Sequence, residues 1–229
     1  MHAGVRLSFP AAACTALLAC SGGGTDNAPP SPSSAPATAS STSEASHLFV
    51  SNPWGFRIDV PSGWSLRQDF QSSHLANDAW KTFAATDSRG EAVLSLIVPG
   101  SNSITDAEIR IGASRDPAEV RRCTEPPSAA VAGSVTTQRV NGVPFRTFEA
   151  RDAAMSHHLD VQSWRVVHDG ACYAIDLLVF GMNPRVYDPP ATPPFSDAHA
   201  FDAMHAVTRT FRFEQPAAQP AASASTAAR

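Results

Sequence analysis

The chain has little positive charge and almost no lysine. Lys81 is its one lysine, and 17 Lys and Arg residues stand against 21 Asp and Glu residues, so the net charge is −4 at pH 7. A protein that binds nucleic acid through its phosphates presents a basic patch or stripe. This sequence has neither, which argues against nucleic acid as a partner. The weak acidity is typical of a soluble surface and indicates no particular partner.

The sequence also lacks the short motifs of common enzyme classes. It contains no G-x-S-x-G, no H-E-x-x-H and no glycine-rich phosphate loop. Carboxylates that could act as acid and base, such as Asp152 with Glu149 or Asp160 with Asp176, are scattered as on a solvated surface. We therefore predict a protein that is not an enzyme and uses no cofactor. An unrecognised hydrolase, whose nucleophile and base meet only in the fold, is an alternative that the sequence leaves open.

No apolar run is long enough to span a membrane. The run between residues 7 and 18 is about a dozen residues long and contains Pro10, whereas a spanning helix needs roughly 20 residues. It follows Arg6 and precedes the small residue Ala19. Segment 1–19 therefore has the parts of a secretory signal peptide.

The tetrapeptide Leu17-Leu18-Ala19-Cys20 resembles the lipobox of bacterial lipoproteins, whose cysteine becomes the lipidated first residue of the mature chain. The resemblance implies a lipid on Cys20, attachment to a membrane and a location in the cell envelope facing the periplasm. Ser21, in place of the aspartate that retains lipoproteins in the inner membrane, favours the outer membrane. The two or three acyl chains of such proteins suffice for stable anchoring, whereas one does not. The alternative is an ordinary signal cleaved elsewhere, which would leave Cys20 as a thiol.

Cysteine usage follows from this processing. Cleavage removes Cys14 and acylation consumes Cys20, so that Cys123 and Cys172 remain in an oxidising compartment where disulfides persist. We predict a disulfide between them that closes a loop of about 50 residues and contributes about 4 kcal/mol. Two separate buried thiols are the alternative. A metal site is disfavoured because neither cysteine lies in a C-x-x-C pair or near a suitably spaced histidine.

Composition divides the mature chain into three parts. Residues 20–47 and 215–229 are rich in Ser, Ala and Pro and cannot bury enough apolar surface to fold, so they are expected to be a disordered tether and a disordered tail. Residues 48–214 are expected to form a single globular domain, which is large enough to make its own core as a monomer.

Hydrophobic patterns within 48–214 predict an α+β domain with a mainly antiparallel β-sheet flanked by helices. The strand at 171–181 is largely apolar on both faces, so both sides of the sheet should be covered. The dipeptides Asn141-Gly142 and Asp169-Gly170 are strong hairpin signals. The expected elements are strands at 56–60, 92–98 and 108–111, a short helix after Asp116, hairpins at 135–150 and 159–181, a helix at 196–208 and a strand at 210–213.

The segment from Gly55 to Trp64, GFRIDVPSGW, resembles the opening strand and turn of PsbP-like domains. The resemblance extends over about residues 48–214 and implies an α/β/α sandwich with an antiparallel sheet. Because that family is functionally heterogeneous, the resemblance implies no activity and no binding residue.

Two groups of side chains are candidates for binding. His157, His158 and Asp160 suggest a metal site, but adjacent residues on a strand point to opposite faces, so we predict no metal there. Of the tryptophans, Trp54 and Trp80 would anchor a partner if they were exposed at a sheet edge, because aromatic residues dominate interface hot spots. The other expectation for them is packing in the core.

These features favour a non-catalytic envelope lipoprotein. Its tethered periplasmic domain is expected to bind or scaffold another envelope component, an envelope protein being one possibility. A module that binds a small molecule or a metal ion is the alternative, and it requires a concave apolar pocket with a few convergent polar groups.

Overall fold

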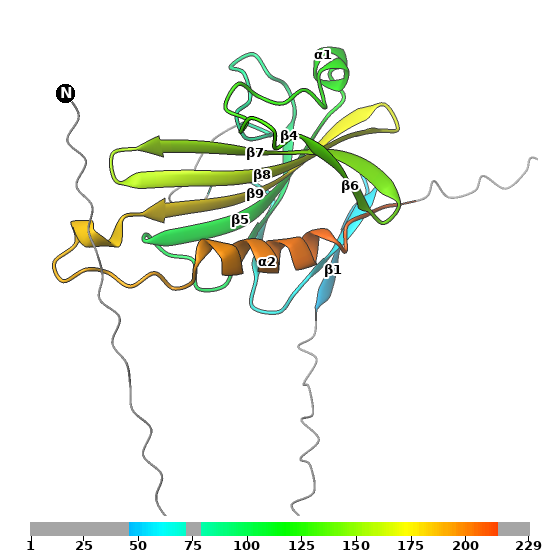
Figure 1. Cartoon of the computed structure of the whole chain (residues 1–229). Helices are drawn as coiled ribbons and strands as arrows, with labels where there is room; N and C mark the ends of the chain where they lie inside the picture. The colour runs from blue at the N-terminus through cyan, green and yellow to red at the C-terminus, as the bar shows by residue number, and fades with distance from the viewer. Residues whose placement is uncertain (1–45, 72–78, 215–229) are drawn as a thin grey trace, which may run out of the picture. The chain divides into compact units, whose positions relative to one another are not determined.

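The structure, a computed structural model, describes residues 46–71 and 79–214, which form two antiparallel sheets and two α-helices (Figure 1). Its elements are β1 (His47–Ser51), β2 (Phe56–Val60), β3 (Ser65–Arg67), β4 (Glu91–Ile97), β5 (Thr105–Ser114), α1 (Pro117–Arg121), β6 (Thr136–Val140), β7 (Val143–Ala154), β8 (His157–His168), β9 (Ala171–Met182), a 3-10 turn (Pro184–Val186), α2 (Asp197–Thr208) and β10 (Arg212–Phe213). The strand orders are β1-β2-β10 and β3-β4-β5-β9-β8-β7-β6. The predicted α+β class with a mainly antiparallel sheet is confirmed.

The two predicted hairpins form four neighbouring strands of the larger sheet, β6 to β9. Asn141 and Gly142 join β6 to β7, and Asp169 and Gly170 join β8 to β9. All four residues have positive φ, between 45° and 86°. Two consecutive residues at positive φ form the turn that matches the twist of adjacent strands. The sequence signal therefore acts by fixing the backbone of the turn and hence the register of the strands.

The first face of the larger sheet carries the main hydrophobic core. On β9 the residues Tyr173, Ile175, Leu177 and Val179 are at most 3% exposed, as the strand pattern predicts. They pack with residues of the smaller sheet and of α2 in one continuous cluster. The helix and the smaller sheet together therefore cover this face.

Helix α2 begins where its capping residue predicts. The hydroxyl of Ser196 accepts a hydrogen bond from the backbone N–H of His199, which satisfies one of the free donors of the first turn. Its buried face consists of Ala200, Met204, Val207 and Thr208. Towards β8, His205 Nε2 lies 2.7 Å from Gln162 Oε1.

Acidification is expected to destabilise the fold through His205. Burial, with a smaller contribution from Arg209, lowers the pKa of His205 below its ordinary value of 6.5. The unfolded chain then binds more protons than the folded protein, so this contribution to stability is complete above about pH 6.5 and declines as the pH falls towards the folded pKa. Urea unfolding at pH 7.5 and 5.5 should show a smaller pH effect for His205→Gln than for wild type.

The control for this measurement is His199→Gln. His199 lies on the same helix but is exposed, so this variant should keep the pH dependence of the wild type. Equal pH dependence of His205→Gln and wild type would contradict the assignment.

The second face of the larger sheet is covered by α1 and by the loop 79–90. Figure 1 shows α1 and α2 on opposite sides of the long strands. Cys123, just after α1, is joined by a disulfide to Cys172 of β9, so the predicted pair is present. The helix-flanked arrangement thus holds on both faces, although one of the two helices is only five residues long.

The expected signal peptide, the lipidated Cys20, most of the tether and the C-terminal tail lie outside the described residues. β1 begins at His47, the last residue of the expected tether. Within the described ranges, neither helix is long and apolar enough to cross a membrane.

Candidate functional site

A row of buried charged side chains crosses the second face of the larger sheet. Glu108 and Arg110 lie on β5, Asp176 on β9 and Arg165 on β8, and each is at most 3% exposed. The sheet register places Arg110 beside Asp176. Charged side chains are almost never fully buried unless they are paired. Each charge in the row is therefore expected to be paired with an opposite charge of the same row.

The first pair in the row is Arg110 with Glu108. Arg110 Nε donates to Glu108 Oε1 at 2.7 Å, and Ser95 Oγ donates to Glu108 Oε2 at 2.6 Å. Burial raises the pKa of Glu108, while the Arg110 charge and the Ser95 hydrogen bond act in the opposite direction. The guanidinium also lies over the ring of Phe70, 5.0 Å from its centroid. This pair is packed under the loop that precedes residue 72.

The second pair, Arg165 with Asp176, is a junction between the sheet and the loop 79–90. Arg165 Nη1 donates to Asp176 Oδ1 at 2.7 Å, and Ser163 Oγ donates to the same oxygen at 2.5 Å. The other oxygen, Oδ2, accepts the backbone N–H of Thr82 at 2.9 Å. One carboxylate thus holds both an arginine and the loop in place.

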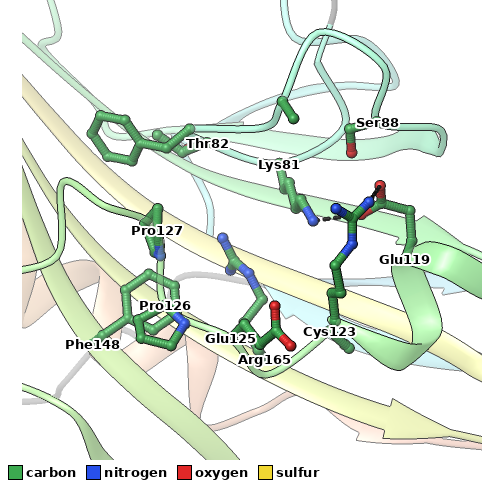
Figure 2. A pocket seen from close by; sticks show the side chains of 13 residues that line it. Lys81, Thr82, Ser88, Glu119, Cys123, Glu125, Pro126, Pro127, Phe148 and Arg165 are labelled. Atoms are coloured by element: carbon green, nitrogen blue, oxygen red, sulfur yellow. Dashed lines mark hydrogen bonds and ion pairs between the residues drawn. The ribbon is translucent and has the colours of Figure 1, made fainter.

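Beside this pair lies a cavity of about 150 Å³ between the loop 79–90, the segment around α1, β7 and β8. In Figure 2, Lys81 and Glu119 lie on one side of the cavity and Pro126, Pro127 and Phe148 on the other, with the Arg165 side chain between them. The cavity therefore combines convergent charged groups with apolar surface, as ligand pockets do.

Helix α1 places Glu119 in the cavity wall. The Asp116 side chain accepts hydrogen bonds from the backbone N–H groups of Ala118, at 2.8 Å, and Glu119, at 3.3 Å. Pro117 occupies the first helical position, where its missing N–H is not needed. The predicted helix start is confirmed, and it fixes the direction in which the Glu119 side chain leaves the helix.

Two cations hold the Glu119 carboxylate. Its side chain is 3% exposed, and Lys81 Nζ lies 2.5 Å from Oε2 while Arg122 Nη2 lies 3.6 Å from Oε1. Lys81 Nζ also lies 4.7 Å from the centroid of the Trp80 ring. The lysine is therefore held in the cavity wall rather than free in solvent.

Thr82 adds an unsatisfied group to the same wall. In the described part of the chain, its hydroxyl is the one buried side-chain oxygen or nitrogen atom without a hydrogen-bond partner. A buried polar atom without a partner costs about 1–3 kcal/mol. Such atoms are uncommon in folded proteins, and this one lies among residues that line the cavity.

Trp54 does not meet the condition for a partner anchor, which was exposure at a sheet edge, and the alternative of packing in the core holds. Trp54 is 5% exposed, because it packs edge-on against Tyr173 with a centroid distance of 6.2 Å. Arg115 covers its ring at 4.1 Å, and its Nε1 donates to Glu91 Oε2 at 3.2 Å. The Trp54 indole therefore packs at the boundary of the hydrophobic core.

Trp80 does not meet this condition either, since it is 2% exposed. Its backbone and ring lie directly on β5 at Gly112, where a Cβ atom would come within 1.7 Å of the Trp80 carbonyl oxygen. Gly90 leaves similar room for the ring, and Trp80 Nε1 donates to Ser88 Oγ at 2.9 Å. The space for Trp80 exists because Gly90 and Gly112 have no side chains. The residues next to Trp80 in the sequence therefore could not predict its burial.

The histidine pair lies at the beginning of β8. His157 stacks on Phe180 at 5.2 Å, whereas His158 faces the start of α2, so the two rings do not converge. His158, Asp160 and Asp197 instead have ligand atoms within 4.8 Å of one another. Those three residues could hold a metal ion.

Two observations weigh against a cation at that cluster. Asp160 already forms an ion pair with Arg151 at 3.1 Å. Asp197 is the first residue of α2, and the positive end of a helix dipole disfavours a cation. The cluster is better described as a polar contact, His158 with Asp197 at 3.2 Å, that fixes the start of α2 on β8.

Sequence reasoning missed the residues of the cavity. The alternation at Glu108 to Ile111 predicted a strand with one apolar face, and the spread of carboxylates suggested that Asp176 is solvated. The structure buries Glu108, Arg110 and Asp176 instead. One available signal was an arginine, Arg165, in the middle of an otherwise apolar strand segment, and another was the solitary Lys81.

The structure defines an α+β protein with a polar cavity on the second face of its larger sheet. No family model and no curated protein sequence matches the chain. A solved structure from Bacteroides thetaiotaomicron is similar over 73% of this chain, with 12% identity and a TM-score of 0.38, and the chain spans about half of that protein, 48%.

Two further solved structures are similar to the chain. One is the cyanobacterial PsbP (CyanoP) of Synechocystis, with 10% identity over 74% of this chain and 93% of the other, and a TM-score of 0.39. The other is LpqN, involved in cell envelope biogenesis of Mycobacterium tuberculosis, with 10% identity over 70% of this chain and 83% of the other, and a TM-score of 0.37.

Proposed function

We propose that the protein is a non-catalytic, lipid-anchored binding protein of the cell envelope. A lipid attached to Cys20 anchors it in the outer membrane, and its domain faces the periplasm. The observation that carries the binding role is the preformed cavity with one charged and one apolar wall. Small-molecule sites are typically apolar pockets with a small number of placed polar groups. The lipobox that ends at Cys20 supports the anchored location.

The arrangement of the carboxylates supports binding rather than catalysis. Glu119 is held by Lys81 and Arg122, and Asp176 by Arg165. An acid–base pair needs carboxylates or other groups that are poised to exchange protons with a substrate. Carboxylates held in ion pairs form a fixed charged wall, which orients a ligand without reacting with it.

A second candidate role is docking to an envelope protein through the edge strand β1. Leu48 and Val50 are 52% and 42% exposed, and alternation places them on one side of the strand. A photo-crosslinking residue at position 50 should capture a discrete partner in cells if this role holds. The domain cross-linking only to itself would reject it.

The test of the proposed function has two parts. In cell fractionation, the wild-type protein should be found with membranes and Cys20→Ser in the soluble fraction. Protein purified without heating should then release a small molecule detectable by mass spectrometry. Ala85→Trp, a change at an exposed loop residue that lines the cavity, is expected to fill the cavity and to abolish this release. Identical small molecules from both proteins would contradict the binding role.

A further inference from the structure

The cavity offers hydrogen-bond donors that its own residues leave unused. The Arg165 side chain is 3% exposed. Its Nη1 makes the hydrogen bonds to Asp176 and to the backbone oxygens of Trp164 and Ile175, whereas Nη2 makes none with the described residues. Figure 2 shows the guanidinium projecting into the cavity. Because Nη2 is not among the buried atoms without a partner, it is open to the cavity, where an acceptor on a ligand can replace water.

A second donor comes from the loop 79–90. Lys81 Nζ contacts Glu119 at 2.5 Å, and an ammonium group has three N–H donors. Its side chain is 16% exposed, so its remaining donors face the cavity mouth rather than bulk solvent on all sides. Arg165 and Lys81 therefore present N–H groups to one space from two elements, β8 and the loop 79–90.

The charges at the cavity balance, which disfavours a ligand with more than one negative charge. The cations at the cavity are Lys81, Arg122 and Arg165, and the carboxylates that line it or back it are Glu119, Glu125 and Asp176. These charges cancel formally. A monoanion therefore adds one uncompensated charge to a partly buried site, and a dianion such as a phosphate monoester adds two, at a higher cost of burial.

The apolar wall defines the rest of the ligand. Phe148 is 3% exposed, and Arg165 lies over its ring at 5.3 Å. Pro126 and Pro127 continue this wall in Figure 2. A cavity of about 150 Å³ holds a ligand of the size of benzene. The ligand should therefore be compact and apolar at the end away from its charge.

We infer that the cavity binds the carboxylate of a small aromatic or cycloaliphatic acid. The carboxylate accepts hydrogen bonds from Arg165 Nη2 and Lys81 Nζ, which are charge-assisted and therefore stronger than bonds between neutral groups. The apolar ring lies against Phe148 and the two prolines. This inference rests on the proposed binding function and names the chemical class of its ligand.

The test measures binding of benzoate to the full-length protein with Cys20→Ser, by calorimetry and by the shift of the thermal unfolding midpoint. Benzyl alcohol keeps the ring but lacks the charge, and inorganic phosphate has charge without the ring. Benzoate should bind about 10-fold more tightly than benzyl alcohol, as expected for charge-assisted hydrogen bonds. Phosphate should give no shift at the same concentration.

Two variants assign the interaction to the cavity. Lys81→Met should weaken benzoate about 10-fold and leave benzyl alcohol unchanged, and Ala85→Trp should block both. Arg139→Met, on exposed β6, is the matched control and should bind benzoate like the wild type. Should Lys81→Met fail to fold, Ala85→Trp decides, because it leaves every ion pair of the cavity in place.

The outcomes separate the ligand class from the binding role. Equal affinity for benzoate and benzyl alcohol, or wild-type benzoate affinity in Ala85→Trp, overturns the carboxylate assignment. If phosphate or a cationic compound binds and Ala85→Trp abolishes that binding, the carboxylate class is wrong and the proposed binding function stands. Loss of co-purified molecules only in Ala85→Trp, together with preferential benzoate binding, supports both.

Discussion

Replacing Cys123 and Cys172 together with alanine is expected to lower the free energy of unfolding by about 4 kcal/mol. The disulfide joins residues 49 positions apart. Closing a loop of that length lowers the conformational entropy of the unfolded chain and so raises its free energy by about this much. For a domain of this size the thermal midpoint should fall by about 8–16 °C. Urea unfolding of the oxidised wild type and of the double variant measures the difference.

A reducing agent provides the control for this prediction. Dithiothreitol should lower the stability of the wild type towards that of the double variant and should leave the double variant unchanged. A loss below about 1 kcal/mol would contradict the loop-entropy argument. It would indicate that the packing of the loop after α1 on β9 holds that segment without the covalent link.

Asp176→Asn is expected to lower the free energy of unfolding by about 3–5 kcal/mol, because it leaves a buried cation without its partner. Asp176 is 1% exposed and accepts hydrogen bonds from Arg165, Ser163 and the backbone of Thr82. The substitution removes the negative charge with little change in volume. Equilibrium unfolding in urea gives the loss, and the near-ultraviolet circular dichroism of the tryptophans should change, because Trp80 lies close to the loop contact at Thr82.

Asp160→Asn is the matched control, since it makes the same substitution one strand away. Asp160 pairs with Arg151, whose side chain is 67% exposed, and surface pairs of this kind contribute about 0–1 kcal/mol. The double variant Asp176→Asn with Arg165→Met should recover part of the loss of the single variant. Equal effects of Asp176→Asn and Asp160→Asn would show that the buried pair contributes no more than the exposed one.

Local signals in the sequence predicted much of the fold. The turns at Asn141-Gly142 and Asp169-Gly170, and the caps at Asp116 and Ser196, depend on a few neighbouring residues whose backbone preferences are strong. The structure places hairpins and helix starts at these positions. Alternation along 171–181 likewise predicted which residues of β9 share a face, because the period of a strand is fixed by its geometry.

The cavity could not be predicted in the same way, because it depends on pairs that are far apart in sequence. Alternation shows that Glu108 and Arg110 share a face but does not show whether another layer covers that face. The loop 79–90 covers that face. Asp176 holds this loop by accepting a hydrogen bond from the backbone N–H of Thr82, which is 94 residues away in the sequence. The burial of Trp80 depends in turn on the missing side chain at Gly112.

The solitary lysine gives the protein an unusual chemical property. The sequence contains one side-chain amine that can react with an acylating reagent, that of Lys81. Lys81 lies in the wall of the cavity beside Glu119. The rate of acylation at this amine therefore measures how open the cavity mouth is, in the intact protein and in whole cells. A lysine-specific protease likewise has a single bond to cut, so cleavage after Lys81 reports on release of the loop 79–90 from the sheet.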